Sequence, residues 1–255
     1  MTSRHIHRIA AIALLAGLTA ACSAEADTAT PPNPATLVAD AARPEADRAL
    51  DADRHPADLL TMLDLKAGQT VADVWPGDYW DRLFANAVGP TGKVYAVHLE
   101  EADKAEQNPT PPAGSTPLAG HPNVIAVVTH ANTLALPAPA DVIWMRQNYH
   151  DLYDKFMGPA DVPLFNRHVF EALKPGGVYV IIDHADAAGT GLSGTETRHR
   201  IEKARVIADV TAAGFKLDGE GAFLANPADD HSKMVFDPAI RGKTDQFILR
   251  FRKPG

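Results

Sequence analysis

Short apolar segments that alternate with helical segments are the feature that most constrains how this chain folds. The strand-like segments are residues 70–74, 93–99, 123–128, 141–145 and 178–183. Helical patterns lie between several of them, at residues 82–87, 161–173 and 195–213. Strands and helices that alternate in this way form a mostly parallel sheet covered on both faces. The sequence therefore predicts an α/β, doubly wound, Rossmann-like domain with helices on both faces.

The C-terminal part of the chain departs from this alternation. Two strand-like runs, residues 215–223 and 245–252, follow each other with no helical pattern between them. Neighbouring strands without a crossover helix are antiparallel, because a parallel connection needs one. We therefore expect seven strands, of which the last is antiparallel. Upstream, residues 43–65 have a helical pattern, and residues 100–122 form a polar, proline-rich insertion.

Residues 1–22 have the pattern of a bacterial export signal. Arg4 and Arg8 precede an apolar run at residues 9–21, which is too short to span a bilayer. The stretch Leu18–Cys22 is similar to a lipobox, in which the cysteine becomes the lipid-bearing first residue of the mature protein; cleavage after Ala26 is the alternative. The prediction is a periplasmic protein, anchored through a lipid on Cys22 to the outer membrane of a Gram-negative bacterium.

The segment after Cys22 is rich in alanine, proline and polar residues. We expect residues 23–42 to be a disordered tether and residues 43–255 to form the folded domain. The formal net charge is −8, which argues against nucleic acid as a partner, since a nucleic-acid groove needs a basic face. It also argues against electrostatic binding to anionic lipid. Membrane contact is therefore expected only through the lipid.

Three segments in or beside the expected strands resemble class I S-adenosylmethionine (SAM)-dependent methyltransferases. They are Val71–Gly77, Gly92–Val97 and Leu173–Val178. Further motifs are similar to those of exported bacterial predicted methyltransferases: Arg43–Pro56, Asn148–Asp151, Asp183-His184 and Asn226–His231. The resemblance implies a methyltransferase that uses SAM as cofactor and a small molecule as substrate.

The resemblance also implies where the cofactor binds. In such sheets a ligand lies in the crevice at the strand C-terminal ends, and a glycine turn after the first strand lets it approach the backbone. At the second strand the family has an acidic residue, whereas this chain has a histidine. The cofactor-binding residues expected on this basis are Asp73, Trp75, Gly77, Tyr79, His98 and His130.

Ionisable residues that follow strands four and five are the catalytic candidates. Tyr149, His150 and Asp151 follow strand four, and His184 ends strand five. Histidine is the usual general base near neutral pH. The alternative is that these residues only stabilise the loops in which they lie. Histidines near the strand ends are good ligands for zinc or copper; they are His98, His150 and His184. No short motif with fixed ligand spacing supports a metal site, so no metal is predicted.

Two other segments have a functional and a structural interpretation. Arg54 either binds a ligand carboxylate or lies on a solvated helix face. The long connection that contains Asn226–His231 either serves the site or is a surface loop. For the whole chain, the leading prediction is a SAM-dependent methyltransferase of the cell envelope. The alternatives are a binding lipoprotein that has lost SAM and a histidine-cluster enzyme that does not transfer methyl groups.

Overall fold

The computed structural model describes residue 1, residues 33–158 and residues 160–255. The predicted signal peptide beyond its first residue, the lipid site at Cys22 and the tether up to residue 32 lie outside the described residues. Within the described part of the chain, no helix combines the length and apolar character needed to cross a membrane.

A seven-stranded sheet forms the centre of the molecule, in the order β3-β2-β1-β4-β5-β7-β6. The pairs among β1 to β5 are parallel, and β7 is antiparallel to both of its neighbours. This confirms the predicted mostly parallel sheet with an antiparallel last strand. The strands are β1 (Thr70–Val74), β2 (Lys93–Leu99), β3 (Val124–Thr129), β4 (Ala140–Arg146), β5 (Leu173–His184), β6 (Lys216–Gly221) and β7 (Gln246–Arg252).

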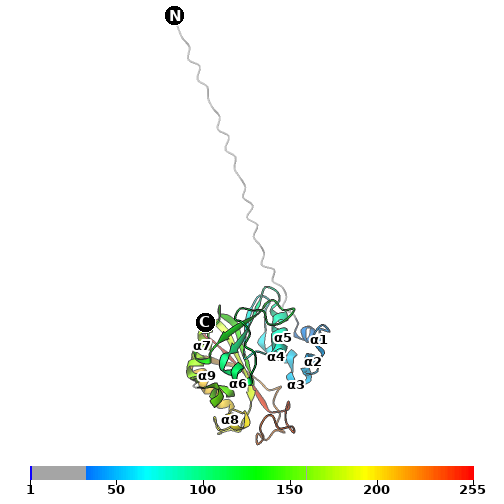
Figure 1. Cartoon of the computed structure of the whole chain (residues 1–255), viewed down its shortest axis with the longest axis vertical. Helices are drawn as coiled ribbons and strands as arrows, with labels where there is room; N and C mark the ends of the chain where they lie inside the picture. Colours follow the sequence, from blue (N-terminus) through cyan, green and yellow to red (C-terminus); the bar gives the residue numbers. More distant parts are fainter. Residues whose placement is uncertain (2–32, 159) are drawn as a thin grey trace.

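Helices cover both faces of the sheet, as predicted. Figure 1 shows α1 to α5 on one side of the sheet and α7 and α9 on the other. The helices are α1 (Pro34–Ala39), α2 (Glu45–Arg48), α3 (Asp51–Arg54), α4 (Pro56–Leu63), α5 (Asp78–Val88), α6 (Glu100–Glu106), α7 (Val162–Ala172), α8 (Thr195–Arg198) and α9 (Lys203–Ala212). Three 3-10 turns are η1 (Ala131–Thr133), η2 (His150–Tyr153) and η3 (Lys155–Met157).

Side-chain alternation along the strands creates two hydrophobic cores. In β5, Val178, Val180 and Ile182 pack in the core beneath α4 and α5. The intervening Tyr179 and Ile181 pack in the other core, beneath α7 and α9. Because successive strand residues point to opposite faces, a strand buried on both sides must be apolar throughout. This explains why β5 reads as a continuous apolar run.

The expected tether begins its ordered structure earlier than predicted. Residues 34–39, which we expected to be disordered, form α1. Asn33 caps this helix by accepting a hydrogen bond from the Ala35 amide at 2.9 Å, and Pro34 stands at the first turn. Leu37 and Val38 pack against the core beneath α4 and α5. These two apolar side chains are enough to dock the segment on the domain. The overall composition of the segment does not reveal them.

Two further expectations need correction. The insertion at residues 100–122 contains a helix, α6, rather than only polar loop. The predicted helix at residues 195–213 is broken into α8 and α9, because His199 adopts the left-handed conformation (φ 51°) and Ile201 forms a β-bridge with Ala185. The break brings His199 next to the C-terminal end of β5.

An ion pair between Arg43 and Asp51 of α3, to which Tyr79 of α5 is hydrogen-bonded, gives a stability prediction. Both terminal nitrogens of Arg43 donate to the Asp51 carboxylate at 2.7 Å, and the Tyr79 hydroxyl donates to it at 2.6 Å. The Arg43 side chain is only 2% exposed. We expect Asp51→Ala to lower the free energy of unfolding by about 3 kcal/mol, because it leaves a buried guanidinium without its counter-charge. Urea denaturation, with the exposed neighbour Asp53→Ala as control, measures the difference; equal stability of the two variants contradicts it.

Candidate active site

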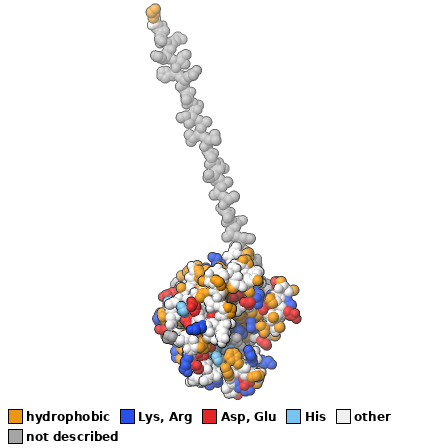
Figure 2. Space-filling model, in the orientation of Figure 1, with side chains coloured by type: hydrophobic (Ala, Val, Ile, Leu, Met, Phe, Trp, Pro, Cys, Tyr) orange, Lys and Arg blue, Asp and Glu red, His pale blue; other side chains and the backbone are white. Residues whose placement is uncertain are grey.

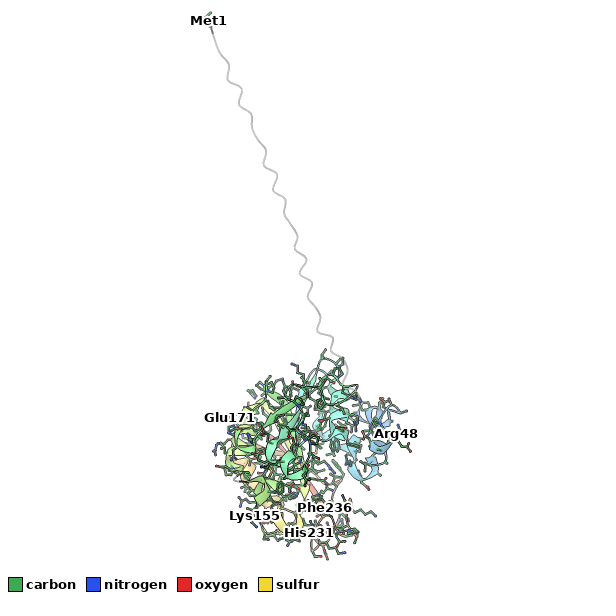
Figure 3. All side chains as sticks on the ribbon, viewed as in Figure 1. Met1, Arg48, Lys155, Glu171, His231 and Phe236 are labelled. Carbon is green, nitrogen blue, oxygen red and sulfur yellow. The ribbon has the colours of Figure 1, made fainter. Side chains whose placement is uncertain are left out.

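A cavity of about 690 Å³ opens at the C-terminal ends of β1, β4 and β5. Its wall is formed by the turn after β1, by the segment after β4, by the end of β5, and by residues of α3, α5 and α6. His199, directly after α8, and the connection before β7 complete it. Figure 3 shows Lys155, His231 and Phe236 at the lower end of the molecule, where Figure 1 shows α8. Ligands of open α/β sheets bind at this edge.

The turn after β1 forms one wall of the cavity. Trp75 has a positive φ of 65°, and its indole nitrogen donates to Glu106 at 3.0 Å. Gly77 follows, and a Cβ at this position would meet no heavy atom within 4 Å. Gly77 thus keeps the backbone open to a ligand, as the sequence predicted, while Trp75 supplies a flat apolar surface.

Two arginines face this cavity. The Arg54 guanidinium lies 4.4 Å from the centre of the Tyr79 ring, and Arg146 ends β4. Burial and repulsion from Arg54 lower the pKa of Arg146 to about 10, which still leaves it charged at neutral pH. Two desolvated guanidinium groups at one cavity favour an anionic ligand group such as a carboxylate. Of the two interpretations of Arg54, the structure supports the ligand-facing one.

Several buried polar atoms without partners belong to residues that border the same space. Asp73 is 2% exposed, and burial together with Asp81 raises the pKa of Asp73 well above its usual range. Four atoms of the cavity wall find no hydrogen-bond partner among residues 33–158 and 160–255: Asp73 Oδ2, Trp80 Nε1, Trp144 Nε1 and Arg146 Nε. Such groups are costly in a dry interior, so the wall is suited to a polar ligand.

Histidines and carboxylates form a cluster at the other end of the wall. His150 Nδ1 lies 2.8 Å from Asp183 Oδ1, and its Nε2 lies 3.1 Å from Asp151 Oδ1. Burial disfavours the imidazolium, but Asp183 and Asp151 outweigh burial and raise the pKa of His150 to about 10. Burial would raise the pKa of Asp151, whereas hydrogen bonds with His150 and His199 lower it to about 2.

His184, the last residue of β5, has an electrostatic environment opposite to that of His150. His184 Nδ1 lies 2.7 Å from the Thr244 hydroxyl. Burial, then repulsion from His150 and Arg146, lowers the pKa of His184 well below its usual value. A neutral His184 beside the carboxylate-paired His150 gives the cavity two imidazoles with different protonation states. Pairs of titratable groups with divergent environments are typical of functional sites.

Six of the ten residues predicted for the site line the cavity, and four do not. Those that line it are Asp73, Trp75, Gly77, His150, Asp151 and His184. His98 instead contacts Asp103 at 3.3 Å and faces a separate cavity of about 160 Å³. His130 is half-exposed beside Glu100 and Glu101. Tyr79 instead donates a hydrogen bond to Asp51 of the Arg43–Asp51 ion pair. Tyr149 is fully buried, and its hydroxyl accepts a hydrogen bond from Asn166.

Several residues that line the cavity were not predicted from the sequence, and they share no motif. They are Glu106, Arg146, Phe156, His199 and Phe236. Arg146 directly follows an apolar strand, a position that signals a site residue. Glu106 belongs to an insertion expected to be loop, and His199 to a helix expected to be continuous. The connection that contains Asn226–His231 contributes Phe236 to the cavity wall.

Backbone conformation also marks this cavity. Seven non-glycine residues have positive φ in the described part of the chain, and three of them, Trp75, Gln147 and His199, line the cavity. Non-glycine residues in this region are uncommon, and they cluster where a fold positions functional side chains.

Several solved structures are similar to this chain. A SAM-dependent methyltransferase from Aquifex aeolicus aligns over 86% of this chain and 97% of its own, with 19% identity and a TM-score of 0.52. Human N-acetylserotonin methyltransferase in complex with SAM aligns over 82% of this chain and 54% of its own, with 14% identity and a TM-score of 0.51.

The chain has the fold of a class I SAM-dependent methyltransferase. The [4+2]-cyclase SpnF also shares it, over 82% of both chains, at 17% identity and a TM-score of 0.50. A shared fold does not by itself assign a reaction. No protein-family model and no curated protein sequence matches this chain.

Proposed function

We propose that this protein is a SAM-dependent methyltransferase that acts on a small molecule in the cell envelope. The observation that carries the proposal is the 690 Å³ cavity at the C-terminal edge of a methyltransferase-type sheet. Its volume lies within the about 300–1,000 Å³ of small-molecule sites.

The residues around Gly77 fit a molecule with the chemistry of SAM. Gly77 leaves the backbone open, and Arg54 and Arg146 suit the carboxylate of an amino acid. Asp73 and Glu106 offer oxygens to an ammonium group or to ribose hydroxyls, and Trp75 offers an aromatic face. When bound, SAM would supply an electrophilic methyl group on its sulfonium. Glu106 then has the cofactor-binding role that the sequence predicts for His98.

The histidine cluster suits the methyl acceptor. Methyl transfer depends chiefly on alignment of the acceptor atom, so the residues that hold the acceptor dominate. His150, Asp151 and His184 lie on one wall and offer hydrogen-bond donors and acceptors. Phe156 and Phe236 are 41% and 51% exposed, and they give the cavity mouth an apolar rim. This combination favours a small acceptor with an apolar body and a polar reactive group.

The cell-envelope location is supported by the export pattern of residues 1–22 and by the lipobox-like Cys22. Figure 2 shows acidic and basic side chains interspersed over the visible face, which agrees with a small-molecule substrate rather than nucleic acid. Detection of the mature protein in the cytoplasm of a bacterium that expresses it would contradict this location.

A substitution at Gly77 tests the cofactor site. Gly77 has extended backbone (φ −143°), so Gly77→Leu places a side chain in open space without strain. We expect it to weaken SAM binding at least about tenfold, or about 1.4 kcal/mol, with an unchanged melting temperature. All three tryptophans of the chain line the cavity, so intrinsic fluorescence reports the titration.

The matched control is Gly219→Leu, because a Cβ at Gly219 also meets no neighbour and this glycine lies in β6, away from the cavity. Equal SAM affinity of both variants and the unmodified protein would place the cofactor elsewhere. No fluorescence response of the unmodified protein would favour the binding-lipoprotein alternative.

A further inference from the structure

Three donor atoms in the histidine cluster form a nearly equilateral triangle. His150 Nε2 lies 3.1 Å from Asp151 Oδ1 and 3.2 Å from His199 Nδ1, and His199 Nδ1 lies 3.3 Å from the same Asp151 oxygen. Metal–nitrogen and metal–oxygen bonds of about 2.1 Å place neighbouring donors about 3.0–3.4 Å apart in octahedral or tetrahedral geometry. The triangle therefore has the dimensions of one face of a metal coordination sphere.

The hydrogen bonds of Asp183 fix which atoms of His150 face the triangle. Asp183 is fully buried and accepts bonds from the backbone amides of His150 and His184 at 2.8 and 2.7 Å. This anchored carboxylate accepts a third bond from His150 Nδ1. Once His150 has lost its Nε2 proton, that atom presents a lone pair to Asp151 Oδ1, which is itself an acceptor. Two facing acceptors need a cation between them, and this is either the proton of the imidazolium or a metal ion that takes the place of the proton.

The contact with Asp183 is also the arrangement that orients a metal-bound histidine. A ligating imidazole usually donates its other ring N–H to a carboxylate, which fixes the tautomer and raises the basicity of the ligand. On the opposite side of the triangle, His199 is held in place by its left-handed backbone (φ 51°) at the end of α8. All three donors line the cavity, so the remaining coordination positions face a bound small molecule.

We propose that His150 Nε2, Asp151 Oδ1 and His199 Nδ1 bind one divalent first-row transition metal ion, with Asp183 as the positioning residue for His150. Two imidazoles and one carboxylate suit Zn²⁺ or Fe²⁺ better than Mg²⁺ or Ca²⁺, which prefer oxygen donors. The open positions would take an oxygen or nitrogen of the small molecule in the cavity. The ion site goes beyond the proposed methyl transfer and does not depend on SAM.

Metal titration of the purified protein after removal of metal with a chelator tests the site. Zn²⁺ is expected to bind with 1:1 stoichiometry and a dissociation constant of about 1 μM or tighter. Co²⁺ is expected to give visible ligand-field absorption that Zn²⁺ abolishes. His199→Gly keeps the left-handed backbone without strain and removes one donor, so we expect at least about 100-fold weaker Zn²⁺ binding. Asp183→Asn is expected to weaken it by about 10–100-fold.

The matched control is His121→Ala, which removes an imidazole whose Nδ1 lies 3.2 Å from the Ala119 carbonyl oxygen and which does not line the cavity. Absence of Co²⁺ absorption from folded protein, or equal Zn²⁺ affinity of the His199→Gly and His121→Ala variants, overturns the proposal. Titration of the same metal-free samples with SAM by tryptophan fluorescence keeps the two questions separate, because a failure of metal binding leaves SAM binding unaffected and the reverse also holds.

Discussion

Replacement of His150 by alanine is expected to lower the rate of methyl transfer by about 10²–10⁴-fold. His150 is 2% exposed and is fixed by two bonds to Asp183 and one contact with Asp151, so its imidazole has a single orientation toward the cavity. It thereby holds the acceptor, directly as a hydrogen-bond donor or through a bound ion. The measurement is transfer of labelled methyl from SAM to a low-molecular-mass extract.

His168→Ala is the control for this experiment, since His168 lies on α7 and does not line the cavity. SAM affinity of His150→Ala should stay near that of the unmodified protein, because the arginines and Gly77 lie elsewhere on the wall. An unaltered transfer rate in His150→Ala would refute the role of this residue in the reaction.

The largest effect on stability is expected from Asp229→Ala. Arg200 is fully buried, and its Nη2 donates to both oxygens of Asp229, at 2.8 and 3.1 Å. Asp229 also accepts a bond from the Asp245 amide at 2.8 Å. Removal of the carboxylate leaves a buried charge without its partner, which costs about 3–5 kcal/mol. Urea denaturation of the variant measures this loss.

Asp230→Ala provides a matched control one residue away, because the Asp230 side chain is exposed and its hydrogen bonds go to Ser232. Its unfolding midpoint should not change. The Asp229 pair also ties the connection that carries Phe236 to the segment after His199, so Asp229→Ala should weaken SAM binding as well. A variant as stable as the Asp230→Ala control would contradict the assignment of Arg200–Asp229 as a structural pair.

The sheet was predictable because β1 to β5 are buried on both faces and therefore read as apolar runs. The ordered N-terminal helix and the broken α8–α9 segment were not. Leu37 and Val38 stand within a segment of disordered composition, and His199 stops a helix with no proline or glycine. Both outcomes depend on tertiary contacts, to the core in one case and to β5 in the other.

For the site, the sequence identified the correct edge of the sheet but not the direction of each side chain. The turn η2 sends Tyr149 into the core and its neighbours His150 and Asp151 toward the cavity. His98 is half-hidden beside Asp103 on α6, a helix that the sequence did not predict. The ends of the strands therefore show approximately where the site lies. Which of two adjacent residues points into the site depends on the local backbone conformation.

Calorimetric titration of residues 27–255 with SAM and with S-adenosylhomocysteine shows whether the cavity at the C-terminal edge of the sheet binds SAM, as we propose. We expect one site per chain with a dissociation constant in the micromolar range, about −8 kcal/mol, and at least about tenfold weaker binding in Gly77→Leu. No heat at millimolar ligand from folded protein would contradict the methyltransferase proposal and leave the histidine cluster as the basis of a different activity.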